Sequence, residues 1–363
     1  MDLTLTPLTP IWTGDAEGIS GSLRITGLMG SLRWWFEGIV RALGRHACDP
    51  TEAACQYDPD PKKNPFHGLC PACWLFGTTG WARRFRLTGS GLHASDWCIL
   101  AAPEVARLHE NWLRRVYKLP GSKVLWGDAL TLQFTPHILG ADALGDADLD
   151  SVFCSLFNAV ARFGALAAKP QNGWGVIAWR EMPQFDRKAL SRFITAFPED
   201  SREMDGMFNV RETAFLSFEI SNVGAYARAA RIPSSASPDY LSRVLPIAYD
   251  IRYKSSTRNF RTGAGRDRGI RPALKNLLGR RAEEIVGTSA RSSQRSASRV
   301  FVSHLYRRSS RGPHRLRCWV HVPPDLERQR EAITSAIQNV VNEMFPGSSG
   351  KLYGWSDFQK EVL

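Results

Sequence analysis

The order of hydrophobic patterns along this chain occurs twice, and it constrains the fold more than any other feature. Apolar residues at alternate positions mark strands, and apolar residues three and four apart mark helices. Each half of the 363 residues reads as strand, helix, two strands, helix, strand. This order is that of the split βαβ arrangement, so we expect an α+β fold. The expected strands are 3–8, 84–88, 129–136, 175–179, 214–221, 299–306, 316–322 and 352–355, and the expected helices 31–44, 111–117, 148–163, 240–253 and 325–345.

The pattern breaks between residues 183 and 207, where we place a domain boundary. The length of the chain also favours two domains. We expect a first domain over 1–195, with a cysteine-rich insertion at about 46–80, and a second over 205–363, with a basic Gly/Arg/Ser-rich insertion at about 255–298. No run approaches the roughly 20 apolar residues of a membrane span. The N-terminus has no basic segment followed by an apolar stretch, so a cytoplasmic protein without a signal peptide or membrane contact is expected.

The segment 23–44 carries the strongest local signal. It reads as a strand end at 23–25, a turn with two glycines, and a helix that opens at Ser31. Backbone N–H groups at a glycine-flanked helix start bind phosphate readily. Arginines and a tryptophan beside that start favour a nucleic acid over a small cofactor, although an ordinary capped helix remains the alternative. The candidate RNA contacts here are Gly30, Ser31, Arg33, Trp34 and Arg41.

Positive charge is concentrated in one part of the chain. The formal net charge is +12, but residues 252–317 hold 18 Lys and Arg against three acids, and the remainder has a net charge of −3. Such a field attracts polyanions. A solvated basic loop is the alternative, above all for the Ser/Arg stretch 288–298.

Four of the seven cysteines lie within 26 residues, at Cys48, Cys55, Cys70 and Cys73. A C-x2-C pair directs two thiolates at one centre, and a second pair completes a tetrahedral zinc site. Four thiolates leave no open position, so we expect structural Zn²⁺. His46 and His67 are possible substitute ligands, and a set of unpaired cysteines is the alternative.

Two glycine-rich loops offer further contacts with a phosphate chain. The first, 163–175, contains Lys169, Gln171, Asn172 and Trp174, and the tryptophan is a possible stacking platform. The second, 258–269, supplies arginines that suit bidentate phosphate contacts. Its candidates are Arg258, Arg261, Arg266 and Arg268, with Arg271 just beyond. Neither loop has a Walker A or dinucleotide-binding spacing. We expect both loops to converge in a single cationic channel.

These motifs together resemble a known family. Six segments are similar to the RAMP proteins of CRISPR–Cas systems, most of all to the first RAMP subunit of type III-B (Cmr) effector complexes. They are LTPIWTGD (8–15), ITGLMGSLRWWFEGIVRALG (25–44), CPACWLFGTTGWARRFRL (70–87), the loop with the sequence GWG (173–175), ASRVFVSHLYRR and RLRCWVHVP. The motif match adds Arg83 and Arg84 to the candidate RNA contacts. The loop 169–174 departs from the family, which often has arginines there.

The resemblance implies a fold of two fused ferredoxin-like (RRM-like) domains. It also implies a non-catalytic subunit that binds the guide RNA near its 3′ end, helps to capture target RNA in antiviral defence, and contacts other RAMP subunits.

Two alternatives follow from the same residues. Some RAMP proteins cut guide-RNA precursors without a metal, which requires a base, an acid and a cation at one phosphate. His46, His304, His314 and His321 are the histidines that such an endoribonuclease could use, and we expect structural or exposed roles for each. A scaffold that binds only proteins is the second alternative, and RNA affinity that is insensitive to salt would favour it.

Overall fold

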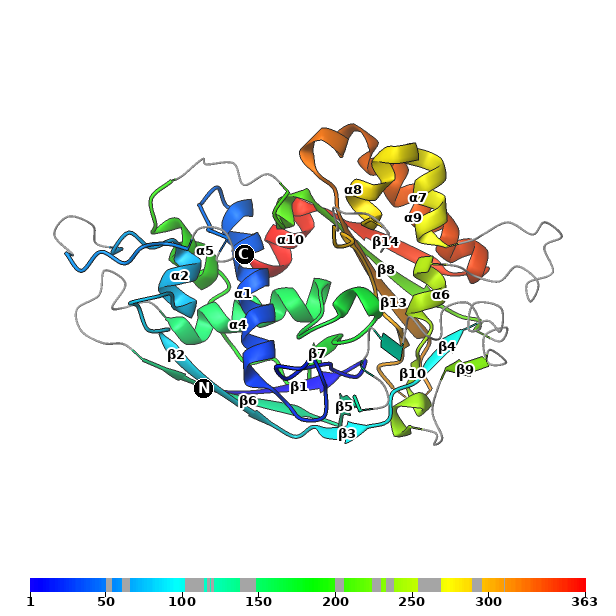
Figure 1. Cartoon of the computed structure of the whole chain (residues 1–363), viewed down its shortest axis with the longest axis horizontal. Coiled ribbons are helices and arrows are strands. Elements are labelled where there is room, and N and C mark those ends of the chain that lie inside the picture. Colours follow the sequence, from blue (N-terminus) through cyan, green and yellow to red (C-terminus); the bar gives the residue numbers. More distant parts are fainter. Residues whose placement is uncertain are drawn as a thin grey trace.

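Two antiparallel sheets, one from each half of the chain, form the framework of the protein (Figure 1). A computed structural model describes residues 1–49, 54–60, 66–101, 114–115, 118, 121–137, 148–199, 206–223, 230–232, 238–253, 269–288, 296–309 and 311–363. The predicted helix 111–117 lies almost wholly outside these residues. The mixed α and β composition that the pattern predicts is confirmed.

The first sheet has the strand order β2-β6-β1-β7, and all neighbouring strands are antiparallel. Its strands are β1 (Asp2–Pro7), β2 (Phe85–Ser90), β6 (Leu130–Pro136) and β7 (Ile177–Trp179). Two helices, α1 (Ile25–Ala42) and α4 (Leu149–Phe163), connect β1 to β2 and β6 to β7. Asp148 caps α4, because its carboxylate accepts a hydrogen bond from Ser151 N at 3.0 Å.

The second sheet repeats this order. Its strands run β10-β12-β13-β8-β14, and β11 also pairs with β13. They are β8 (Thr213–Ile220), β10 (Val244–Leu245), β11 (Val300–Val302), β12 (Leu305–Tyr306), β13 (His314–His321) and β14 (Ser349–Tyr353). Three helices, α6 (Ala248–Tyr253), α7 (Ile270–Leu278) and α9 (Arg330–Met344), contact one another beside this sheet.

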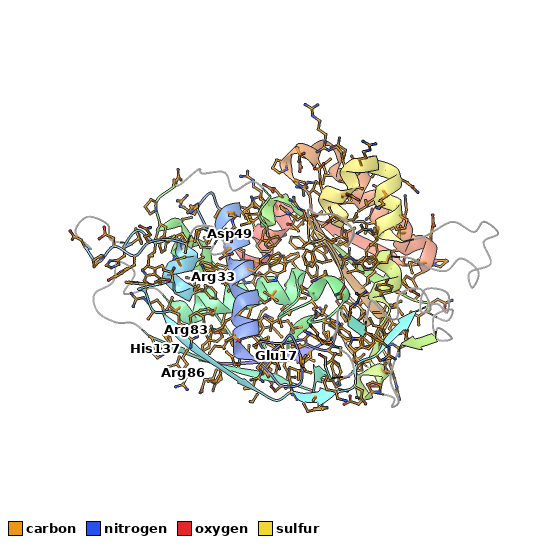
Figure 2. All side chains as sticks on the ribbon, viewed as in Figure 1. Glu17, Arg33, Asp49, Arg83, Arg86 and His137 are labelled. Atoms are coloured by element: carbon orange, nitrogen blue, oxygen red, sulfur yellow. The ribbon has the colours of Figure 1, made fainter. Side chains whose placement is uncertain are left out.

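Side chains on the two faces of the second sheet pack into two different cores, and so this sheet joins the two halves of the chain. In β13, Leu316 and Cys318 belong to the core beneath α6, α7 and α9, whereas Trp319 belongs to the core of the first half. In β8, Leu216 and Phe215 divide in the same way. Successive side chains of a strand point to opposite faces, so this sheet is buried on both faces. Figure 2 shows the side chains that fill the space between the sheets and helices.

The remaining elements are short. They are the helices α2 (Pro71–Phe76), α5 (Ala189–Thr195), α8 (Glu283–Val286) and α10 (Trp355–Val362), the 3-10 turns η1 (Pro170–Asn172), η2 (Val210–Glu212), η4 (Asp239–Ser242), η5 (Gly279–Ala282) and η6 (Pro324–Gln329), and the strand pairs β3 (His93–Ser95) with β5 (Val124–Trp126) and β4 (Ile99–Ala101) with β9 (Ala230–Ile232). None of the described helices is long and apolar enough to span a bilayer.

The predicted start of the first helix is wrong. The helix α1 begins at Ile25 after Arg24, so 23–25 is not a strand end, and Gly30 and Ser31 lie inside the helix. The buried stripe continues upstream of Ser31 to Leu28, which holds the glycine-containing segment in the helix. A phosphate seat formed by a helix start at Ser31 is therefore excluded.

Two predictions in the second half also need correction. The expected helix 240–253 is a 3-10 turn, the short strand β10 and the helix α6, because β10 pairs with β12 and Pro246 separates it from the helix. The expected strand 299–306 is two strands, β11 and β12. Between them, Ser303 Oγ accepts a hydrogen bond from Arg317 N at 2.8 Å and replaces a ladder contact. The expected basic insertion, for which a solvated loop was the alternative, contains α7 and α8.

Candidate metal centre and nucleic-acid interface

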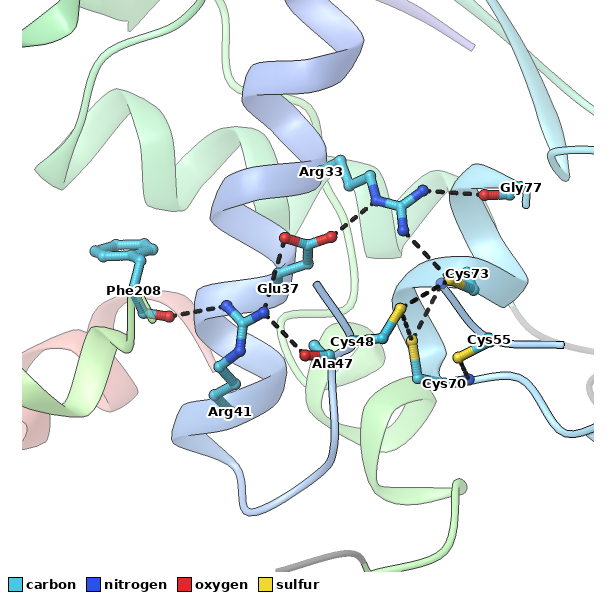
Figure 3. A network of polar contacts seen from close by, with 10 residues as sticks. All are labelled: Arg33, Glu37, Arg41, Ala47, Cys48, Cys55, Cys70, Cys73, Gly77 and Phe208. Atoms are coloured by element: carbon cyan, nitrogen blue, oxygen red, sulfur yellow. Dashed lines mark hydrogen bonds and ion pairs between the residues drawn. The ribbon is translucent and has the colours of Figure 1, made fainter. Parts of the chain in front are cut away.

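Four cysteines from separate segments of the chain meet at one point, as the sequence predicts (Figure 3). The Sγ atoms of Cys48, Cys55, Cys70 and Cys73 all lie within 4.8 Å of one another. The Sγ of Cys48 is 3.3 Å from that of Cys73 and 3.8 Å from that of Cys70. A tetrahedron with Zn–S bonds of about 2.3 Å places its sulfurs about 3.8 Å apart. The cluster therefore has the dimensions of a four-thiolate metal site.

The helix α2 sets the position of two of these thiols. Cys70 is its N-cap and Pro71 its first residue, a position at which proline is favoured. The amide of Cys73 donates to Cys70 Sγ and that of Cys70 to Cys55 Sγ, both at 3.4 Å. Gly77 ends the helix at a φ of 90°, and a Cβ there would lie 2.9 Å from Arg83 N. Only glycine lets the chain turn back at this point.

Arg33 connects α1 to this cluster (Figure 3). Its Nε donates to Glu37 Oε1 at 2.8 Å, its Nη1 to Gly77 O at 3.0 Å and its Nη2 to Cys73 Sγ at 3.2 Å. The side chain is only 18% exposed. Arg33, a candidate RNA contact from the sequence, thus supports the cysteines.

Arg41, one helical turn beyond Glu37, also donates its hydrogen bonds to protein groups. Its Nη1 donates to Phe208 O at 3.1 Å and its Nη2 to Ala47 O at 2.9 Å. Its side chain is 9% exposed. Because Ala47 directly precedes Cys48, Arg41 fixes the approach of the chain to the first thiol.

Hydrogen bonds among the four thiols shift their pKa values in opposite directions, because they raise the pKa of Cys48 and Cys70 and lower that of Cys55 and Cys73. Hydrogen bonds from Cys48, Cys55 and Cys70, followed by the charge of Arg33, hold the pKa of Cys73 well below its usual range. A hydrogen bond with Cys48 lowers the pKa of Cys55 to about 7. Thiolates are the form that binds metals. His67 is not among the clustered groups, since its Nδ1 lies 2.8 Å from Asp58 O. Four sulfur ligands close the coordination sphere, so a bound ion would be structural.

A cavity of about 530 Å³ opens where the two halves meet. The first half contributes Ser31, Trp34 and Gln171 to its lining, all three predicted from the sequence as RNA contacts. The second half contributes His321, named above as a candidate for an endoribonuclease, and residues that the sequence alone does not single out, including Phe208, Arg299 and Phe301. The cavity therefore brings predicted sites of one half against the other half.

Trp34 forms the aromatic wall of this cavity. Its ring stacks on Phe208 with a centroid distance of 3.7 Å and an interplanar angle of 9°. A Cβ at Gly38 would lie 2.4 Å from the Phe208 ring, so the absent side chain of Gly38 makes room for Phe208. Trp34 is only partly buried, in contrast to the neighbouring Trp35.

The glycine loop of the first half lies against the second half. Arg252 of α6 donates to Gln171 O and, at 3.4 Å, to Asn172 Oδ1. Arg252 lies close in sequence to the second predicted loop, which begins at residue 258. Lys169 Nζ is 5.4 Å from the centroid of Trp12, and burial lowers the pKa of this lysine.

Trp174 is fully buried, so its ring is not available as a stacking platform in this structure. The ring meets His304 edge-on, at a centroid distance of 4.3 Å. Gly173, at a φ of 102°, allows this approach, since a Cβ there would lie 2.6 Å from His304 Nδ1. The tryptophan between two glycines is a core residue that joins the halves.

The basic pair after α2 is divided between surface and core. Arg83 is exposed, on the same side of the molecule as Arg86 (Figure 2). Arg84 is buried, with its guanidinium 3.8 Å from the centroid of the Trp81 ring. This geometry is a cation–π contact that stabilises the fold.

The candidate arginines of the second loop lie outside the described residues, whereas Arg271, just beyond the loop, is described. They are Arg258, Arg261, Arg266 and Arg268. Arg271 of α7 donates to Val286 O at 2.6 Å and to Gly287 O at 2.9 Å, so it holds α7 to the end of α8.

Comparison with known proteins decides the family. Residues 4–178, which include α1, the cysteine cluster and the glycine loop, match the model of the RAMP superfamily. This part of the chain is a RAMP domain. The resemblance of the motifs in this part of the chain to the RAMP proteins is thereby confirmed. No curated protein matches the sequence.

Two solved structures are similar to this chain over most of its length. The crystal structure of Cmr1 from Pyrococcus furiosus in its apo form is 9% identical, with 96% of this chain and 97% of that chain covered and a TM-score of 0.45. A chain of the type III-B Cmr-beta cryo-EM structure, bound to cognate target RNA and AMPPnP, is 9% identical, with 95% and 99% covered and a TM-score of 0.45. A likeness at this identity and TM-score says nothing of function.

Three of the four histidines that a RAMP endoribonuclease could use are held in protein contacts. His304 is fully buried, and burial lowers its pKa to about 3. Burial also lowers the pKa of His314, to about 4, and Arg307 donates to its Nδ1. His321 is paired with Glu212 at 2.9 Å and reaches the wall of the cavity.

Sequence reasoning missed the second wall of the cavity. Arg299 and Phe301 belong to the quoted segment ASRVFVSHLYRR, and that resemblance was the available signal. Phe208 carried no signal, because its role depends on packing against Gly38, 170 residues earlier in the chain.

Proposed function

We propose that this protein is a non-catalytic RNA-binding subunit of a type III-B (Cmr) CRISPR effector complex in the cytoplasm. It would bind the guide RNA near its 3′ end, help to capture target RNA in antiviral defence, and contact neighbouring RAMP subunits. The observation that carries the proposal is the meeting of the two most specific motifs of the resemblance. Arg33 of the R-W-W helix donates to Cys73 and Gly77 of the C-x2-C-x2-F-G segment, within the part that matches the RAMP superfamily.

The proposed RNA contacts are those that remain accessible. Ser31, Trp34 and Gln171 line the cavity, and Gly30 and Arg83 are exposed. Lys169 and Asn172 lie on the same glycine loop and are partly exposed. The arginines Arg258, Arg261, Arg266 and Arg268 are proposed from the sequence alone. We assign Arg33, Arg41, Arg84, Trp174 and Arg271 to the support of this surface, because their side chains contact protein groups.

The proposed fold is a pair of fused ferredoxin-like domains over 1–195 and 205–363. Both sheets support it, since each has the strand order 2-3-1-4 when its main strands are numbered along the chain. A βαββαβ unit yields this order.

The metal that we propose is Zn²⁺. The donor set supports zinc, because four thiolates in a tetrahedral arrangement suit it better than hard cations. Cys48, Cys55, Cys70 and Cys73 would hold the ion, and Arg33 would offset part of the negative charge of the thiolates. The ion would supply structural cross-linking of α2 to the preceding segment.

Salt dependence of RNA binding tests the proposed function. Binding of a single-stranded RNA by the whole chain should weaken steeply between low and moderate salt, because several phosphates are neutralised. Charge reversal of Arg258, Arg261, Arg266 and Arg268 should lower the affinity for RNA and make that affinity less dependent on salt. Binding that is insensitive to salt would favour the protein scaffold. Cleavage of a guide-RNA precursor by the isolated chain would favour the endoribonuclease.

A further inference from the structure

The cavity at the meeting of the halves is more than a packing defect. Its volume of about 530 Å³ lies within the range of roughly 300–1,000 Å³ that is typical of ligand pockets. Its walls come from α1 and the glycine loop on one side and from the segments around Phe208 and Phe301 on the other. Most of the lining is apolar, with a few polar groups, which is the usual make-up of a ligand site.

Two aromatic rings offer surface to an occupant. Trp34 and Phe301 both line the cavity and both are only partly buried. Each is stacked on another ring: Trp34 on Phe208 at 3.7 Å, and Phe301 on Trp319 at 4.8 Å with an interplanar angle of 5°. Rings that are fixed in this way lose little freedom when a planar ligand stacks on them.

The cationic group of the cavity is Arg299. Its Nη1 is buried and, within the described part of the chain, has no hydrogen-bond partner. The nearby carboxylate of Glu212 is engaged by His321 Nε2 at 2.9 Å. A buried guanidinium nitrogen without a partner is costly, and an anion against the rest of this partly exposed side chain offsets part of that cost.

An aromatic wall and an arginine with a free donor suit a nucleotide. We propose that the cavity holds one unstacked base of a bound single-stranded RNA, with the base against Trp34 and the adjoining phosphate at the guanidinium of Arg299. Stacking of splayed bases on aromatic side chains is a common mode of single-strand recognition. Arg299 also belongs to the segment 252–317, whose net charge of +15 favours a polyanion over a peptide. This inference rests on the proposed RNA-binding function and adds a base-binding site to it.

Affinities for an oligoadenylate RNA at several salt concentrations test the site. Trp34→Ala should weaken binding about 5- to 150-fold, the range that loss of one stacked base represents, without change in the slope of log Kd against log salt. Arg299→Gln should weaken binding and also reduce that slope by about 0.7, because one phosphate contact is lost. Trp355→Ala and Arg328→Gln are matched controls away from the cavity, and both should bind like the wild type.

A variant that fills the cavity gives a second test, which does not depend on removing a packed side chain. Ser31→Phe keeps the stack of Trp34 on Phe208 but occupies the cavity, so it should also lose affinity with an unchanged salt slope. If the wild-type chain binds RNA with steep salt dependence and all three cavity variants bind equally well, the base-binding site is wrong while the proposed function stands. If the wild-type chain does not bind RNA, the proposed function fails.

Discussion

Arg317 Nη1 in β13 donates a hydrogen bond to Gly164 O at the end of α4, at a distance of 2.6 Å. The same guanidinium reaches Ala161 O at 2.8 Å and Val160 O at 3.3 Å. These carbonyls form the negative end of the helix dipole, so the buried arginine caps α4 from the other half of the chain. One side chain thus fixes the second sheet on the helices of the first.

Replacement of Arg317 tests this connection. We expect Arg317→Met to lower the free energy of unfolding by about 3 kcal/mol, because the carbonyls of a buried helix end lose their donors. Arg315→Gln is the matched control from the same strand, since Arg315 pairs with Glu219 at the surface and should cost at most about 1 kcal/mol. Urea denaturation measures both. Equal effects of the two substitutions would contradict the capping role.

The cysteine cluster predicts a metal content. The purified chain should contain about one zinc per molecule, and Cys73→Ser should lower both the zinc content and the melting temperature. Cys154→Ser is the control, because Cys154 is buried in α4 outside the cluster. Elemental analysis and thermal unfolding measure these quantities. Full zinc occupancy in the Cys73 variant would remove this thiol from the metal site.

We expect replacement of Arg33 to lower the stability of the fold rather than to remove a direct contact with RNA. Arg33→Ala removes contacts with Glu37, Gly77 and Cys73, and leaves Glu37 buried, so we expect a loss of about 3 kcal/mol. Arg281, in an exposed pair with Glu284, is the control, and Arg281→Ala should lower the free energy of unfolding far less than Arg33→Ala. Chemical denaturation decides between them, and an Arg33 variant as stable as the control would refute the bridging role.

His304 predicts a dependence of stability on pH. Burial lowers its pKa from 6.5 to about 3, so the unfolded chain binds this proton at a higher pH than the folded chain. The stabilisation of the folded chain that comes from neutral His304 is therefore complete above pH 6.5. It is lost as the pH falls towards 3, at roughly 1.4 kcal/mol per pH unit well below 6.5. His304→Gln should reduce this slope, measured by denaturation at several pH values. His93→Gln, at an exposed site, should leave it unchanged.

Much of the fold follows from the sequence, because periodicity marks elements that bury one face. The strand β6 and the helix α4 agree with prediction almost to the residue. The start of α1 was wrong, since glycines that suggest a turn are accommodated inside a helix with a continuous buried stripe. The helices α7 and α8 were missed because charge dominates their segment and hides the short apolar pattern.

The candidate site also has a part that the sequence predicts and a part that it does not. The cysteine cluster could be predicted, because thiol spacing along the chain limits what can meet. The roles of Arg33 and Arg84 could not, since exposed and buried arginines look alike in a sequence and only packing against Cys73 or Trp81 distinguishes them.

The central claim is that RNA lies along the surface where the two halves meet. Ultraviolet cross-linking of the whole chain to single-stranded RNA, with the attached peptides identified by mass spectrometry, tests it most directly. The account predicts cross-links in peptides that contain Trp34 and Phe301, from opposite walls of the cavity. Cross-links confined to other surfaces, on a chain that binds the RNA, would contradict it.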